Sequence, residues 1–78
     1  MKIELMVNKN NLPDKGFPKL ENEFTRRILL RWPEAVIRVR KGNNNALTVL
    51  RALSTDKKLV SQLLEEMFDE ADEWLYEH

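Results

Sequence analysis

The sequence contains no cysteine, only two glycines and a single histidine, His78. Without cysteine the chain forms neither disulfides nor thiolate metal sites, which fits the reducing environment of the cytoplasm. It also lacks the apolar run of about 18 residues that a membrane-spanning helix requires, and it lacks the apolar segment of a signal peptide. We therefore expect a cytoplasmic protein that is neither exported nor embedded in a membrane.

The same scarcity of reactive side chains argues against catalysis. The one imidazole lies at the terminus, and the sequence has neither a glycine-rich phosphate loop nor a serine with a neighbouring base. Adjacent carboxylates act as an acid–base pair only inside a cleft that separates their pKa values. No calcium-binding loop and no Glu-x-x-His motif is present, so the carboxylates are expected to attract cations only incidentally. The expectation is no enzyme activity, no cofactor and no metal site.

The 78 residues are expected to form one domain, 1–78, without a linker. Three segments carry apolar residues at alternate positions or are rich in β-forming residues, which predicts half-buried strands at 2–7, 35–41 and 46–53. The last two strands are separated only by Gly and Asn residues at 42–45, a composition typical of a hairpin connection.

Two further segments repeat apolar residues at helical spacing. The first helix is predicted at 18–32, because Pro33 disfavours helical backbone in the residue before it. The second is predicted as one helix over 56–76, with Ser54 or Thr55 as its N-cap. The order β-α-β-β-α predicts an α/β (α+β) two-layer sandwich, in which both helices cover one face of a three-stranded mixed sheet. The order of the strands stays open.

Charge is unevenly distributed along the chain. Residues 1–61 hold all 13 basic residues and 6 acidic ones, a net charge of +7, whereas residues 62–78 hold the other 7 acidic residues. On a helix of about 100° per residue these acids lie opposite an apolar stripe, which assigns Phe68 and Trp74 to the core. We call this acidic arc the acidic ridge, and its members are Glu65, Glu66, Asp69, Glu70, Asp72, Glu73 and Glu77.

The acidic ridge is expected to lower stability. Seven pairs of its residues lie three or four positions apart, and like charges at these spacings cost about 0.2–0.5 kcal/mol per pair on a helix. A solvated face, or ion pairs with Arg26, Arg27 and Arg31 of the first helix, would explain the ridge without any partner. The absence of lysine and arginine within the ridge favours a surface that meets a basic partner.

The chain resembles the DinI family over nearly its whole length. The matching segments are "MKIEL", "TRRI" followed by "WP", "IRVR", "NNALTV", "TDK" and, most specifically, "LLEEMFDEADEWL". The resemblance implies the β-α-β-β-α fold and a small bacterial regulator of the RecA recombinase in the SOS response to DNA damage. It implies that the acidic last helix docks on RecA filaments on single-stranded DNA.

The resemblance also implies which residues bind the partner. The positions that match the family pattern are Glu66, Asp69, Asp72 and Glu73. The shared arc adds Glu65, Glu70 and Glu77. Because related proteins include prophage- and virulence-associated ones, a different basic partner is one alternative. Weak nucleic-acid binding through Arg38 and Arg40 is another, although the predicted strands offer no aromatic side chains for base stacking. We expect a monomer without direct nucleic-acid contact.

Overall fold

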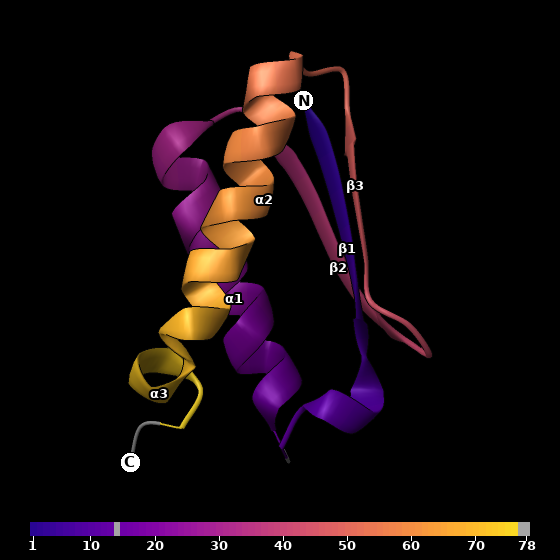
Figure 1. Ribbon diagram of the computed structural model, residues 1–78, viewed down its shortest axis with the longest axis vertical. Helices are drawn as coiled ribbons and strands as arrows, with labels where there is room; N and C mark the ends of the chain where they lie inside the picture. The colour runs from indigo at the N-terminus through magenta and orange to yellow at the C-terminus, as the bar shows by residue number, and fades with distance from the viewer. Residues whose placement is uncertain (14, 77–78) are drawn as a thin grey trace.

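The computed structural model describes residues 1–13 and 15–76. Its elements are β1 (Lys2–Asn8), the 3₁₀ turn η1 (Lys9–Asn11), α1 (Gly16–Arg31), β2 (Val36–Gly42), β3 (Ala46–Leu50), α2 (Ser54–Asp69) and α3 (Ala71–Trp74). Figure 1 shows the strands on one side of the molecule and the long helices α1 and α2 on the other. The predicted two-layer sandwich, with both long helices on one face of a three-stranded mixed sheet, is confirmed.

β1 is the central strand of the sheet, whose order is β2-β1-β3. It runs parallel to β2 and antiparallel to β3, so that Leu5 lies opposite both Val39 and Leu47. The prediction of a hairpin between the second and third strands is therefore wrong, although both segments are strands. The inner residues of β1 are at most 3% exposed, whereas the edge strand β2 carries Arg38 and Arg40 in solvent. The most deeply buried strand thus takes the centre, and the charged strand takes an edge.

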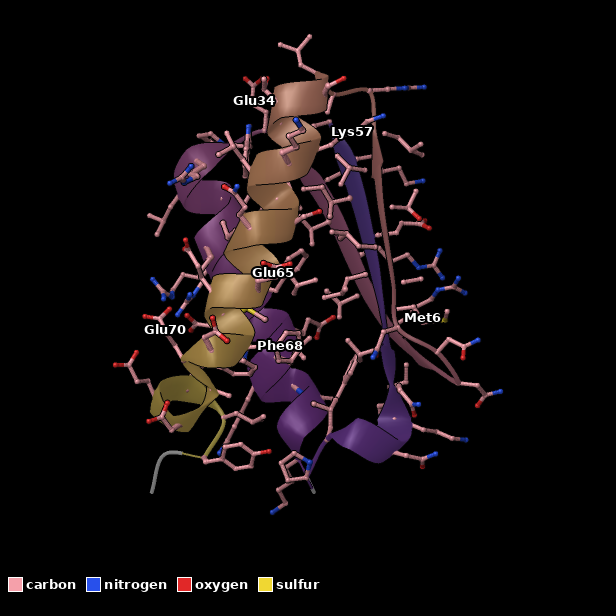
Figure 2. All side chains as sticks on the ribbon, viewed as in Figure 1. Met6, Glu34, Lys57, Glu65, Phe68 and Glu70 are labelled. Carbon is pink, nitrogen blue, oxygen red and sulfur yellow. The ribbon has the colours of Figure 1, made fainter. Side chains whose placement is uncertain are left out.

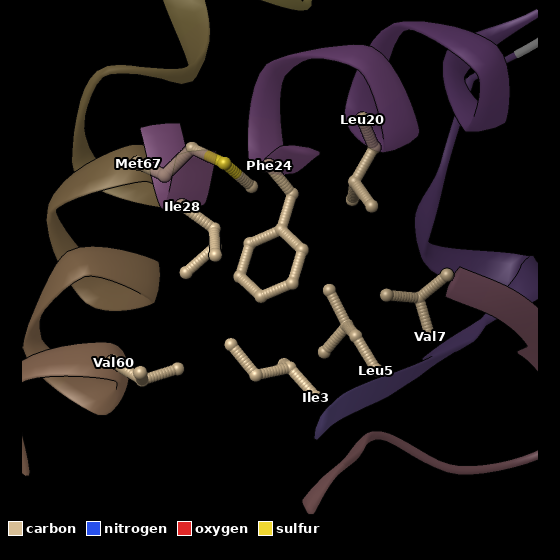
Figure 3. Close-up of a cluster of buried hydrophobic side chains, with 8 residues drawn as sticks. All are labelled: Ile3, Leu5, Val7, Leu20, Phe24, Ile28, Val60 and Met67. Atoms are coloured by element: carbon tan, nitrogen blue, oxygen red, sulfur yellow. The ribbon is translucent and has the colours of Figure 1, made fainter. Parts of the chain in front are cut away.

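The side of the sheet that faces the helices holds the hydrophobic core. Successive residues of β1 point to opposite faces, and Met6 extends away from the helices (Figure 2). The core consists of residues that alternate on β1 or recur at helical spacing on α1 and α2 (Figure 3): Ile3, Leu5, Val7, Leu20, Phe24, Ile28, Val60 and Met67. The alternation and the helical spacing in the sequence predicted these positions correctly.

The long helices begin close to their predicted positions, but the N-cap of α2 differs. Leu53 is the N-cap residue, and the Asp56 carboxylate accepts a hydrogen bond from the Leu53 N–H at 3.4 Å. Ser54 and Thr55 are already the first two helical residues. The prediction that one of them caps the helix is therefore wrong, because the side chain of Asp56 satisfies the backbone from within the first turn.

The single helix predicted over 56–76 is broken in the structure. α2 ends at Asp69, and the short helix α3 follows after Glu70 (Figure 1). The Met67 carbonyl oxygen, at the end of α2, accepts hydrogen bonds from the Glu70 N–H at 3.2 Å and from the Trp74 indole N–H at 2.6 Å. The indole of Trp74 therefore holds α3 against the last turn of α2.

Burial of Leu75 also stabilises the break after α2. Leu75 is only 5% exposed and packs at the start of α1, where a Cβ atom on Gly16 would lie 3.2 Å from Leu75 Cδ1. The Lys19 ammonium donates a hydrogen bond to the Leu75 carbonyl oxygen at 3.4 Å. The residues after Glu70 thus reach α1, and these contacts are specific to the folded tertiary structure.

Candidate partner-binding surface

The acidic residues of the predicted ridge lie on two helices rather than one. Those on α2 are Glu65, Glu66 and Asp69, and those on α3 are Asp72 and Glu73. All five are exposed, and we call them the acidic surface. Glu70 lies between the two helices, and Glu77 lies outside the described residues.

Glu70 differs from the acidic surface because it forms an ion pair with α1. Arg27 Nη1 lies 2.7 Å from Glu70 Oε1, and Arg27 Nε also donates to Glu23. Arg26 forms a second ion pair with Glu23, at 2.6 Å. Figure 2 shows Glu70 just after the end of α2, on the side opposite to Phe68. The first helix therefore neutralises one member of the predicted ridge.

The ion pairs on α1 shift the pKa values of their members. The hydrogen bond from Arg26, assisted by that from Arg27, outweighs desolvation and lowers the pKa of the Glu23 carboxyl below its usual range. Burial of the Arg27 guanidinium acts to lower its pKa, but hydrogen bonds to Glu23 and Glu70 together raise that pKa above its usual value. Both shifts favour the charged forms, so this cluster stays paired at neutral pH.

The five carboxylates of the acidic surface form no ion pair with any part of the chain that the structure describes. Arg31 lines a small hollow of about 50 Å³ between α1 and α2 together with Glu66. It is nevertheless not paired with Glu66 or any other carboxylate in the described ranges. Most of the negative charge of residues 62–76 is therefore exposed to solvent.

The break between α2 and α3 reduces the like-charge repulsion that was expected within the acidic ridge. Asp69 lies on α2, whereas Asp72 and Glu73 lie on α3. Because these residues do not share one helix axis, the repulsion expected for pairs on a single helix does not apply to them. Asp72 and Glu73 instead lie on α3, a helix of only four residues, so they no longer oppose the dipole at the C-terminus of a long helix. Asp69 still repels Glu65 and Glu66 on α2, at about 0.2–0.5 kcal/mol per pair. The expected cost from seven like-charge pairs on one helix is therefore too high.

The sequence assigned Phe68 to the core, and this assignment is wrong. Phe68 is 42% exposed, whereas Trp74 is half-buried, and their ring centroids lie 6.1 Å apart. Phe68 lines a hollow of about 420 Å³ between α2 and the sheet, which sequence reasoning missed. The available signal was its position at the edge of the apolar stripe, one turn from Glu65.

Arg38 and Arg40 lie where the sequence predicted, on the outer face of the sheet. Both are exposed, while the residues that alternate with them on β2, Ile37 and Val39, pack toward the core. None of the three strands contains an aromatic residue. This face therefore offers positive charge without the stacking side chains that typical single-strand binding sheets use.

Within the described residues, no three His, Cys, Asp or Glu side chains gather in a way that could hold a metal ion. No helix in this part of the chain combines the length and the apolar character needed to cross a bilayer.

Comparison with known proteins identifies relatives along almost the whole chain. Residues 13–75 match the DinI-like family. The chain is 35% identical to DNA damage-inducible protein I of Serratia marcescens, with 95% of each chain covered. It is 35% identical to DNA damage-inducible protein I of Escherichia coli K12, again with 95% of each chain covered. It is 37% identical to virulence protein MsgA of Salmonella typhimurium, with 96% of each chain covered.

Proposed function

Because the chain belongs to the DinI-like family, we propose that it is a non-enzymatic regulator that docks on a basic protein surface through its acidic surface. The partner that we propose is the RecA filament on single-stranded DNA, in the SOS response to DNA damage. The name of two relatives, DNA damage-inducible protein I, supports this setting. Glu70 and Glu77 flank the acidic surface and are proposed as additional partner contacts.

The observation that carries the proposal is the unpaired state of the acidic surface. Its five carboxylates are exposed and form no ion pair within the described residues, although Arg26 and Arg27 lie on the neighbouring helix. A concentrated negative surface accelerates encounter with a basic partner and orients it, and docking relieves the repulsion among the carboxylates.

A double charge reversal tests this proposal directly. Asp69→Lys with Glu73→Lys should weaken binding to RecA filaments on single-stranded DNA by about 10-fold or more, because truncating or reversing paired charges costs on this order. The matched control is Glu21→Lys with Glu34→Lys, which changes the net charge by the same amount as the test variant. Glu21 lies on α1, and Glu34 lies in the turn after it. Figure 2 shows Glu34 at the end of the molecule remote from Glu70. Affinity would be measured by fluorescence anisotropy over a range of salt concentrations.

Each outcome of this measurement decides between alternatives. Equal affinity of the wild type and the Asp69/Glu73 variant would exclude the acidic surface as the docking site. If the wild-type protein does not bind RecA filaments at all, a different basic partner is favoured. Retardation of labelled single-stranded DNA by the protein alone, lost in an Arg38→Ala, Arg40→Ala variant, would favour nucleic-acid binding instead.

A further inference from the structure

A pocket of about 420 Å³ lies between α2, the end of β1 and the start of β3. We call it the apolar pocket, because most of its lining is apolar: Leu5, Val7, Leu12, Leu47, Leu64 and Phe68. The volume falls within the range of about 300–1,000 Å³ that is typical of ligand pockets. The pocket therefore has room for at least one bulky apolar side chain.

The wall of the apolar pocket is held in place before any ligand binds. The Phe68 ring lies 6.1 Å from the Trp74 ring at an interplanar angle of 59°, and Trp74 is itself tied to the Met67 carbonyl oxygen. On the opposite side, the Asn8 N–H donates to Asn45 Oδ1 at 2.7 Å, which joins the end of β1 to the loop before β3. A pocket whose walls are fixed in advance loses little conformational entropy on binding.

Two exposed carboxylates on α2 are next in sequence to residues that line the apolar pocket, since Glu65 follows Leu64 and Asp69 follows Phe68. Glu65 lies one helical turn before Phe68, Asp69 follows it directly, and both are exposed without an ion pair among the described residues. Figure 2 shows Phe68 extending from α2 toward the sheet, with Glu65 one turn above it. An apolar cavity beside unpaired carboxylates is complementary to an apolar side chain flanked by cations.

We propose that the apolar pocket takes one bulky apolar side chain, of the size of leucine, from a lysine- or arginine-rich segment of the protein partner. Phe68 and Leu64 contact this side chain, while Glu65 and Asp69 pair with the flanking cations. The inference rests on the proposed function in taking the partner to be a basic protein surface, and it adds an apolar anchor to the electrostatic contact. At many interfaces a few side chains that fill well-packed pockets carry most of the binding energy.

Two synthetic peptides test the pocket on the unaltered protein. One has a single leucine flanked by lysines, and the other has serine in place of the leucine. The leucine peptide should bind about 10-fold more tightly, as expected for burial of one leucine side chain. In nuclear magnetic resonance titrations it should shift the amide signals of Leu47, Leu64 and Phe68. Equal affinity of the two peptides, or shifts confined to other regions, would overturn the proposal.

A second experiment separates the pocket from the proposed docking function. Phe68→Ala should weaken binding to RecA filaments by about 10-fold without changing charge. Leu30→Ala is the matched control, because Leu30 is an apolar residue of α1 that is 72% exposed. If Phe68→Ala binds as tightly as Leu30→Ala while Asp69→Lys loses binding, the docking function stands and the pocket fails. If the unaltered protein does not bind the filaments, that partner is wrong, and the peptide titration decides on the pocket.

Discussion

The charged edge of α1 and the acidic surface lie on neighbouring helices, but their charges are balanced in different ways. On α1, Glu23 is paired with both Arg26 and Arg27, and Arg27 also reaches Glu70. The five carboxylates of the acidic surface have no such partner within the described residues. Internal neutralisation therefore stops at Glu70, next to Asp69 in the sequence.

This difference shows that the fold separates acids that look equivalent in the sequence. Arg27 is only 17% exposed at its side chain and already serves two carboxylates, so it is not available to the acidic surface. The turn at Glu70 directs one acid toward α1, while Asp69 remains in solvent. The unpaired carboxylates of the acidic surface are therefore the groups that an external cation would stabilise most.

The largest change in the free energy of unfolding is expected from Trp74→Ala, which removes the side chain that fixes α3. Loss of its packing and of its hydrogen bond to Met67 should lower the free energy of unfolding by about 2–3 kcal/mol, less than for a fully buried tryptophan. Urea denaturation measures this change. Trp74→Phe is the control, which keeps an aromatic ring tilted against Phe68 but removes the N–H and should cost about 1 kcal/mol. A cost below about 0.5 kcal/mol for Trp74→Ala would show that other contacts hold α3.

A smaller effect is expected from Arg27→Met, which removes the link between the two charged regions. The variant leaves Glu70 unpaired and Glu23 with one partner, so the free energy of unfolding should fall by about 1–2 kcal/mol. Arg26→Met is the matched control, because Arg26 is 59% exposed at its side chain and its loss should cost less than about 0.5 kcal/mol. Equal costs for the two variants would contradict a special role for Arg27.

Much of the fold could be predicted because its signals are local. Alternation placed Ile3, Leu5 and Val7 on the buried face of β1, and helical spacing placed Phe24 and Ile28 in the core. The strand order was not predictable in this way. It depends on which strand gains most from the central position, and the short Gly/Asn connection favoured a hairpin that the sheet does not form.

The candidate site was predictable in composition but not in geometry. The run of acids identifies the charged region, yet the break at Glu70 depends on contacts between distant residues, such as Leu75 with Gly16. The pairing of Glu70 with Arg27 depends in turn on how α1 packs beside α2. The exposure of Phe68 likewise follows from the pocket between α2 and the sheet. Of these features, only the exposure of Phe68 has a signal in the periodicity of the chain, namely its position at the edge of the apolar stripe.

The smallest expected effect is also the sharpest test, because it compares two neighbouring acids. Asp69→Lys should raise the free energy of unfolding by about 0.5–1 kcal/mol, because it replaces repulsion from Glu65 and Glu66 with attraction and places a cation at the end of α2. The melting temperature should then rise by about 2–8 °C. Glu70→Lys carries the same change in net charge but opposes Arg27 with a second cation, so its melting temperature should fall. If both variants shift in the same direction, the boundary between paired and unpaired acids does not lie between these two residues.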